Sequence, residues 1–247
     1  MQQPTQKRLQ KLLADAGIGS RRRIENLIAN KQIKINGKVA ELGSKASSKD
    51  RISIADIDIQ LPKQPNHKAL FYHKPLGTIV SRSDPQSRPT VFDNLPQLQN
   101  SRWISVGRLD INTSGLLLFC SDGQLAHRLM HPATEIERTY LVRIRGTVSA
   151  TTIEHLLNGV RLDDGEACFK QLSRHNNRRG WYKVVVAEGR NRLIRRLWAS
   201  QGLLVDKLIR VGFGRFELTD NLARGAYRIA TKSELDCLYK MAGLSLS

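Results

Sequence analysis

A polar stretch with two prolines divides this chain into a short first part and a long second part. Pro62 and Pro65 lie among mostly polar residues in the stretch 61–68. Prolines without an apolar pattern are typical of an exposed connector that keeps two folded units apart. The 247 residues are enough for one large domain, or for a large and a small one. We therefore expect a first domain at 1–60, a linker at 61–68 and a second domain at 69–247.

The chain is strongly basic. It contains 40 Lys and Arg against 22 Asp and Glu, which gives a formal net charge of +18. Because neutralised phosphates release counterions and supply most of the binding free energy, this excess indicates RNA or DNA as the partner. A membrane is the competing partner for basic charge, but no apolar run approaches the roughly 20 residues of a spanning helix. The polar opening also lacks the apolar core of a secretory signal, so we expect a cytoplasmic protein.

Cysteine and histidine show no pattern that predicts a metal site. Cys120, Cys168 and Cys237 are odd in number and lie far apart, which argues against a disulfide framework or a zinc ribbon. His127 and His131 have the spacing of one helix face, but they lack a third ligand and the glutamate of a zinc-protease motif. We expect these histidines to pack or to contact RNA, and we expect neither a metal nor a cofactor.

The first domain opens with a pattern of two helices. Apolar residues recur at helical spacing over 7–16, and Ser20 is a suitable N-cap for the next helix. Arg21, Arg22 and Arg23 then occupy the first turn, where three cations oppose the helix dipole. A bound phosphate would relieve this repulsion. The alternative is that the arginines are solvated or pair with Glu25.

A basic hairpin follows these helices. Asn36-Gly37 suits a two-residue type I′ turn between strands at 33–35 and 38–40. The whole order resembles the S4 RNA-binding module, with matches at 8–11, 19–22 and 35–37. The resemblance implies RNA contacts from Arg8, Lys11, Ser20, Arg21, Arg22, Lys34 and Lys38.

In the second part, one carboxylate has a reactive setting. Asp110 lies between the turn-forming Gly107-Arg108 and a Ser114-Gly115 break. A carboxylate kept ionised by an arginine is a good nucleophile or base. The alternative is a structural Asx turn, in which the Asp110 side chain accepts backbone N–H bonds from the residues that follow.

The segment 107–116 resembles the catalytic motif of the pseudouridine synthases, in the branch that includes one enzyme of the small ribosomal subunit and the B, E and F enzymes of the large one. The segments 73–77, 137–142 and 194–195 match further motifs of this family in the same order. The proline-containing loop 81–96 resembles that of the B enzymes more than that of the small-subunit enzyme.

The resemblance implies a role for four residues. Asp110 is the catalytic carboxylate, Arg108 enters the space that the flipped nucleotide leaves, Tyr140 stacks on the uracil, and Arg195 is the ion-pair partner of Asp110. Tyr140 as a core residue and Arg108 in a salt bridge to Asp122 or Glu135 are the structural alternatives. Further RNA contacts are expected from Lys74, Arg82, Arg88, Arg190, Arg192 and Arg196.

Fold and function follow as expectations. The fold class is α+β, with the S4-like module and a larger domain that has a mixed, mainly antiparallel sheet. The implied reaction converts a uridine of 23S rRNA, near the peptidyl-transferase centre, to pseudouridine. Alternatives are a synthase acting on 16S rRNA or another RNA, or a non-catalytic rRNA-binding assembly factor. A DNA-binding regulator is disfavoured because no dimeric helix-turn-helix pattern is present. We expect a monomer whose partner is ribosomal RNA or its precursor.

Overall fold

The computed structural model describes residues 6–61, 67–99, 101–176 and 178–245. The chain forms two compact units. One contains residues 1–67 with 96–103 and 121–123, and the other contains the remaining residues from 68 onwards. Most of the expected linker lies outside the described residues, including both of its prolines. Among the described residues, no helix has the length and the apolar composition to cross a bilayer.

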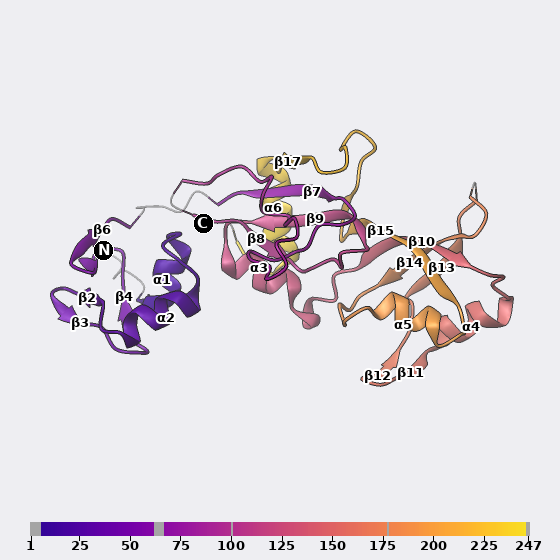
Figure 1. Cartoon of the computed structure of the whole chain (residues 1–247), viewed down its shortest axis with the longest axis horizontal. Helices are drawn as coiled ribbons and strands as arrows, with labels where there is room; N and C mark the ends of the chain where they lie inside the picture. Colours follow the sequence, from indigo (N-terminus) through magenta and orange to yellow (C-terminus); the bar gives the residue numbers. More distant parts are fainter. Residues whose placement is uncertain (1–5, 62–66, 100, 177, 246–247) are drawn as a thin grey trace. The chain divides into compact units, whose positions relative to one another are not determined.

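The first unit is built from short helices and strands, drawn in indigo to purple in Figure 1. Its four-stranded sheet has the order β3-β2-β5-β6, and β1 pairs with β4. Leu9, Leu13, Ile24 and Ile33 form part of its fully buried core. The elements are β1 (Lys7–Arg8), α1 (Leu9–Asp15), α2 (Arg21–Ala29), β2 (Ile33–Ile35), β3 (Lys38–Val39), β4 (Lys45–Ala46), β5 (Ile52–Ile54) and β6 (Ile57–Ile59).

Two local predictions for this unit are confirmed. Ser20 caps α2, because its side-chain oxygen accepts the Arg23 backbone N–H at 3.1 Å. Asn36 and Gly37 join β2 to β3 with φ angles of 48° and 83°. Positive φ at both positions is what a type I′ turn requires.

The second unit is organised around one mixed sheet. Its strand order is β13-β14-β10-β15-β9-β7-β17, with β16 paired to β15 and β8 paired to β9. The β9–β15 pair is parallel, and the other described pairs of this sheet are antiparallel. In Figure 1, β15 lies between β7 and β9 on one side and β10, β13 and β14 on the other. The expected α+β fold, mainly antiparallel, is therefore confirmed.

In the described part of this unit, the strands range from two to ten residues and four α-helices accompany them. The strands are β7 (Ala69–Lys74), β8 (Ile104–Val106), β9 (Ser114–Cys120), β10 (Arg138–Arg145), β11 (Val160–Leu162), β12 (Gly165–Ala167), β13 (Gln171–Arg174), β14 (Trp181–Val186), β15 (Leu204–Phe213), β16 (Phe216–Glu217) and β17 (Tyr227–Ile229). The helices are α3 (Gly123–Met130), α4 (Ala150–Asn158), α5 (Leu193–Ala199) and α6 (Lys232–Met241), with a 3₁₀ turn η1 (Pro132–Thr134).

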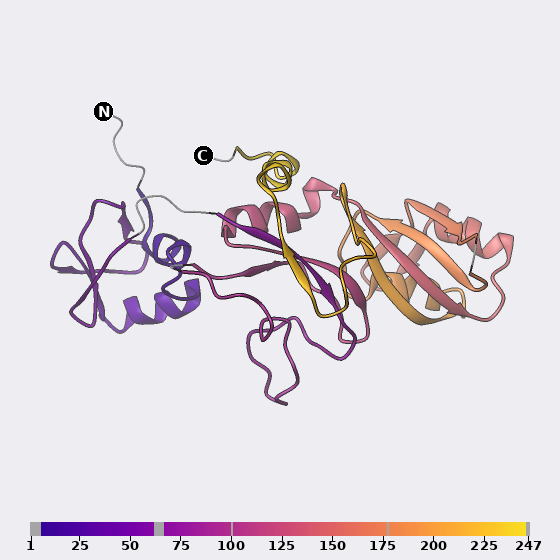
Figure 2. The ribbon, with the colours of Figure 1, turned by 90° about the horizontal axis from the view of Figure 1, so that it is seen from above.

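Apolar packing fixes the helices on this sheet. Leu125 and Leu129 of α3, and Leu238 of α6, share one buried cluster with Phe71 of β7 and Leu118 of β9. Figure 2 shows both helices on the same face of these strands. On the other half of the sheet, α5 packs against β15. Both halves of the sheet are therefore supported by helices that pack on them.

Gly115 makes the central parallel pairing possible. It lies opposite Arg210 in the β9–β15 register and has a φ of +112°. A Cβ at this position would overlap the Arg210 carbonyl oxygen and lie 2.6 Å from the Arg210 backbone nitrogen. Only glycine allows both this φ and this approach. Gly115 thus sets the distance between β15 and the segment that carries Asp110.

Candidate active site

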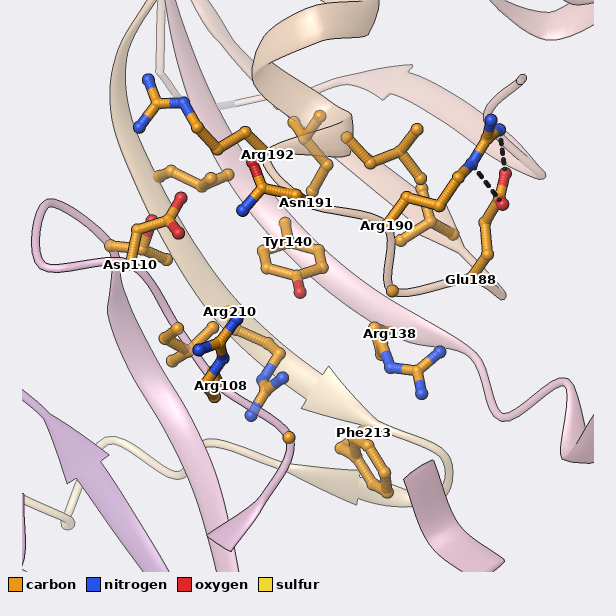
Figure 3. Close-up of a pocket in the computed structure, with 18 of the residues that line it drawn as sticks. Arg108, Asp110, Arg138, Tyr140, Glu188, Arg190, Asn191, Arg192, Arg210 and Phe213 are labelled. Atoms are coloured by element: carbon orange, nitrogen blue, oxygen red, sulfur yellow. Dashed lines mark hydrogen bonds and ion pairs between the residues drawn. The ribbon is translucent and has the colours of Figure 1, made fainter. Parts of the chain in front are cut away.

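A cavity of about 530 Å³ opens over the centre of the second unit's sheet. Its walls come from the loop 105–110, the segment 188–194, and the strands β10 and β15. Figure 3 shows Asp110, Tyr140, Arg108 and Arg210 among the side chains around it. The volume lies within the range of small-ligand sites and is sufficient for one nucleotide base with its sugar.

Asp110 lies in the turn between β8 and β9. The Thr113 backbone N–H donates to the main-chain oxygen of Asp110 at 3.0 Å, so the backbone closes this turn by itself. In the described part of the chain, the Asp110 carboxylate accepts no hydrogen bond and forms no ion pair within 4 Å. The structure therefore does not show the Asx turn that was the structural alternative. The half-buried carboxylate is left facing the cavity.

Tyr140 is buried like a core residue and also lines the cavity. Its side chain is only 8% exposed, as expected of a core residue on β10. It also lines the cavity, together with Ile194 and Leu208. An aromatic ring held by its neighbours and open on one side is suited to stacking on a flat base.

The expected ion pair between Arg195 and Asp110 is not formed. Arg195 donates instead to the main-chain oxygens of Asn112, at 2.9 Å, and Val205, at 3.0 Å. Burial lowers the pKa of Arg195, and the nearby Arg192 lowers it further, while the charge of Asp110 acts in the opposite direction. The prediction of a direct pair was wrong because Arg195 reaches the backbone of the Asp110 loop before it reaches the carboxylate.

The prediction that Lys74 contacts RNA is also wrong. Its side chain is 0% exposed, so it cannot reach a phosphate at the surface. The Lys74 ammonium donates to the main-chain oxygens of Thr113, at 2.9 Å, and Pro75, at 3.0 Å. Burial lowers its pKa from 10.5 to about 8, against an opposing attraction from Asp110. Lys74 and Arg195 therefore hold the Asp110 loop at two successive carbonyls.

Arg108 lines the cavity and is exposed. Within the described residues it forms no ion pair, and the alternative salt bridge to Glu135 is absent. Its side chain is thus available to a ligand that enters the cavity.

The arginines before and within α5 differ in their partners. Arg190 and Arg196 both bind Asp164, at 3.0 Å and 2.8 Å, and Arg190 also pairs with Glu188 at 2.8 Å. The hydrogen bond from Arg196 is the main reason why the pKa of Asp164 is lowered. The Arg192 backbone is in a left-handed conformation, and its exposed side chain forms no hydrogen bond or ion pair in the described regions. RNA contact by these three residues stays a prediction, and it is simplest for Arg192.

The loop 81–96 holds its arginines close to the protein. Arg88 forms a bidentate ion pair with Asp84, at 2.9 Å and 2.7 Å, which lowers the pKa of Asp84 to about 2. The Arg82 guanidinium lies over the Phe92 ring, 4.5 Å from its centroid. Both remain candidate RNA contacts.

The candidate RNA-binding residues of the first unit are mostly at its surface. Arg21, Arg22 and Lys38 are exposed. Lys34 is paired with Asp56 at 2.6 Å, which restrains it. The full set that the sequence predicted is Arg8, Lys11, Ser20, Arg21, Arg22, Lys34 and Lys38.

Two buried arginines of the site were missed by the sequence analysis. Arg138 and Arg210 are 8% and 2% exposed, and both line the cavity. The available signal was their position, since Arg210 follows Leu208 at the period-two spacing of one strand face. A charged residue on an inward strand face indicates a functional site.

The histidine pair lies on and after α3. The His127 and His131 ring centroids are 5.7 Å apart, and His131 Nδ1 accepts the Ala133 backbone N–H at 3.2 Å. Within the described residues, no three His, Cys, Asp or Glu side chains are grouped as a metal site.

Comparison with known proteins matches both units. The family model described as RNA pseudouridylate synthase matches residues 68–200, and the S4 domain model matches residues 7–52. A solved structure described as a pseudouridylate synthase aligns with a TM-score of 0.66 and 28% identity, covering 94% of this chain and 99% of that one. Both resemblances in the sequence are therefore confirmed.

Curated relatives agree with this assignment. The ribosomal large subunit pseudouridine synthase B of Pseudomonas aeruginosa is 49% identical over 246 residues. That alignment covers 98% of this chain, which spans 64% of the relative's length. The enzyme with the same name from Pasteurella multocida is 46% identical, over 96% of this chain and 70% of its own length. This chain belongs to the RNA pseudouridylate synthase family.

Proposed function

We propose that this protein converts a uridine of large-subunit ribosomal RNA to pseudouridine, with Asp110 as the catalytic carboxylate. The target that we expect lies in 23S rRNA near the peptidyl-transferase centre. The observation that carries the proposal is the Asp110 carboxylate, which faces the cavity without a hydrogen bond in the described part of the chain. The relatives named above act, by their names, on the large ribosomal subunit.

The chemistry requires few groups. The bond from C1′ to N1 breaks, the uracil turns, and C1′ joins C5, while C5 loses a proton and N1 gains one. One carboxylate can promote this by attack on C1′, by attack on the uracil ring, or by removal of the 2′ proton. Each route requires the nucleotide to leave its stack and enter a pocket. The cavity beside Asp110 provides such a pocket, and Tyr140 provides a ring on which the base can stack.

RNA binding is assigned to both units. Exposed arginines at the start of α2 are suited to phosphate contacts, because the S4 unit places them at its surface. Arg108 and Arg192 are suited to the strand around the flipped nucleotide. We further propose that the protein acts as a monomer in the cytoplasm, on ribosomal RNA or its precursor.

The test maps pseudouridines by carbodiimide-blocked primer extension on rRNA from cells that lack this protein. The cells are complemented with the wild type, with Asp110→Asn, or with Asp220→Asn as an exposed control outside the cavity. We expect one large-subunit site to be lost, and to be restored by the wild type and the control alone.

The other outcomes are informative. If the pseudouridine that is lost and restored lies in small-subunit rRNA, the substrate is 16S rRNA. Full restoration by Asp110→Asn would remove Asp110 from the mechanism. An unchanged map would favour another RNA substrate, or a non-catalytic role in ribosome assembly.

A further inference from the structure

Arg210 is a buried cation whose guanidinium makes one hydrogen bond in the described part of the chain. Its side chain is 2% exposed, and its Nε donates to the Leu116 main-chain oxygen at 2.7 Å. One terminal nitrogen is fully buried without a hydrogen-bond partner. Among the described residues, neither terminal nitrogen has an acceptor. A buried charged donor without an acceptor destabilises the fold more than a neutral one does.

Arg138, the other buried arginine of this cavity, has main-chain acceptors for one of its terminal nitrogens. Its guanidinium donates to the main-chain oxygens of Ala187, at 2.6 Å, and Ile136, at 3.0 Å. Burial lowers the pKa of Arg138, and the charge of Arg210 also lowers it. The Arg210 guanidinium lies over the Phe213 ring, 5.7 Å from its centroid, and Arg138 lies over the same ring at 5.5 Å. A ring supplies no oxygen acceptor, so within the described residues the terminal nitrogens of Arg210 lack the main-chain acceptors that Arg138 has.

The strand register places Arg210 between Tyr140, which lines the cavity, and Gly115, which begins the close approach of β9 to β15. It is directly opposite Tyr140 of β10 and opposite Gly115 at the start of β9. Directly opposite residues on one face have Cβ atoms about 5 Å apart. The register with β10 shifts by one residue next to this pair, and such irregularities re-aim side chains near active sites. Arg210 lines the same cavity as Tyr140 and Asp110 (Figure 3).

We infer that Arg210 is a catalytic residue whose guanidinium donates to a carbonyl oxygen of the target uracil. This inference rests on the proposed function. A base that stacks on Tyr140 presents its edge to the neighbour of Tyr140 across the strands, which is Arg210. The uracil carbonyl then supplies the acceptor that the protein does not supply.

The contact would act on the charge that the reaction develops. When the bond from C1′ to N1 breaks, its electron pair passes to the uracil, which shares the negative charge between N1, O2 and O4. Addition of a carboxylate to the ring likewise moves an electron pair onto a carbonyl oxygen. The charge disappears when C5 joins C1′ and the C5 proton is replaced by one on N1. A fixed guanidinium at O2 or O4 stabilises this charge, as donors in an oxyanion hole do.

The experiment pairs protein variants with altered substrates. Wild type, Arg210→Met and Arg210→Lys are tested with an RNA fragment that contains the target as uridine, 2-thiouridine or 4-thiouridine. A fourth fragment carries a methylphosphonate in place of the phosphate of the target nucleotide. Single-turnover rates and RNA affinities are measured for every pair. Arg138→Met serves as the matched control, since it also removes a buried guanidinium from the cavity wall.

We expect Arg210→Met to lower the single-turnover rate on the uridine fragment about 100-fold, with RNA affinity nearly unchanged. One of the two thio substitutions should slow the reaction of the wild type much more than it slows the reaction of Arg210→Met. Sulfur is a poor hydrogen-bond acceptor, and the variant has no guanidinium donor to lose. Arg210→Lys should recover part of the rate and part of this sensitivity. Arg138→Met should be slowed by the thio substitutions as much as the wild type is.

Three results would overturn the inference. Equal sensitivity of wild type and Arg210→Met to both thio substitutions would leave Arg210 with a structural role. If only the methylphosphonate fragment affects the wild type more than Arg210→Met, Arg210 contacts the phosphate and not the uracil. Wild-type rates in Arg210→Met would exclude any role. If the wild type itself forms no pseudouridine, the proposed function fails, and this outcome is distinct from the other three.

Discussion

Cations occupy opposite environments in the two units of this protein. In the S4 unit, Arg21 and Arg22 are exposed at the start of α2. In the second unit, Lys74 and Arg210 are at most 2% exposed. Exposed cations contribute affinity for phosphates and are screened by salt. Buried cations are screened much less, and their partners are specific carbonyls, so they position a site or stabilise charge within it.

The same comparison explains how the Asp110 loop is held. Lys74 binds the carbonyl of Thr113, and Arg195 binds the carbonyl of Asn112. Lys74 extends from β7, the neighbour of β9 in the sheet, and Arg195 extends from α5, which packs against β15. Because the cations bind the backbone, the carboxylate of Asp110 is left available for chemistry. Basic residues of this chain therefore act by position, in addition to any contact with RNA.

The largest effect is expected from the carboxylate itself. Asp110→Asn removes the proposed nucleophile or base while it keeps the shape of the side chain. We expect the single-turnover rate to fall by at least about 10⁴-fold. Filter binding should show RNA affinity within about twofold of the wild type, since the shape of the cavity and the exposed cations are unchanged. A parallel loss of affinity and rate would mean that Asp110 acts in binding.

The next largest effect is expected from a change in the pairing of β9 with β15, beside the loop that carries Asp110. In Gly115→Ala, the new methyl group overlaps the Arg210 backbone and the residue keeps a φ of +112°. We expect the free energy of unfolding to fall by about 3 kcal/mol, with loss of activity.

Gly225→Ala is the control for Gly115→Ala. Gly225 also has a positive φ, of +80°, but no atom lies within 4 Å of the position that its new methyl group would take. The free energy of unfolding of Gly225→Ala should fall by only about 1 kcal/mol, because of backbone strain. Equal losses in urea unfolding would show that the close approach of β9 to β15 is not what requires glycine.

A third prediction uses the titration of Lys74. Its pKa is about 8 when folded and 10.5 when unfolded, so the unfolded chain binds more protons between these values. Stability attributable to Lys74 therefore rises as the pH increases from about 8 to 10.5, because the burial penalty of the charge is removed. Over this pH range, the free energy of unfolding of the wild type should rise by at most about 3 kcal/mol relative to that of Lys74→Met. Urea unfolding at about pH 7, 9 and 10.5 measures the difference, and a constant difference would contradict it.

The smallest effect is expected at the exposed cations. Arg21→Ala combined with Arg22→Ala should weaken RNA binding about tenfold at low salt and reduce the slope of log affinity against log salt by about 1.5. Turnover at saturating RNA should be unchanged.

Arg51→Ala is the matched control for that double variant, because Arg51 is exposed in the same unit but already paired with Asp58 at 2.8 Å. Arg51→Ala should change the slope of log affinity against log salt less than the double variant does. Unchanged affinity of the double variant at both low and high salt would remove these arginines from the RNA-binding surface.

Local signals in the sequence predicted the parts of the fold that local interactions decide. The Ser20 cap and the Asn36-Gly37 turn each depend on a few adjacent residues, and both are confirmed. The family motifs predicted the α+β fold, and the structure brings Asp110 and Tyr140, which lie in two of those motifs, to one cavity. The partners of Lys74 and Arg195 were missed, because a basic residue in a motif carries no information about which carbonyl it meets.

The sequence by itself therefore determined the two-unit order, the basic character of the chain and the carboxylate at the centre of the candidate site. Only the tertiary structure decided which cations are buried and what they contact. Arg210 meets the carbonyl of Leu116 across 94 positions of sequence, and Arg195 meets that of Asn112 across 83. Such contacts depend on the parallel pairing of β9 with β15, which a strand pattern does not specify because strand partners are chosen by packing of the whole sheet.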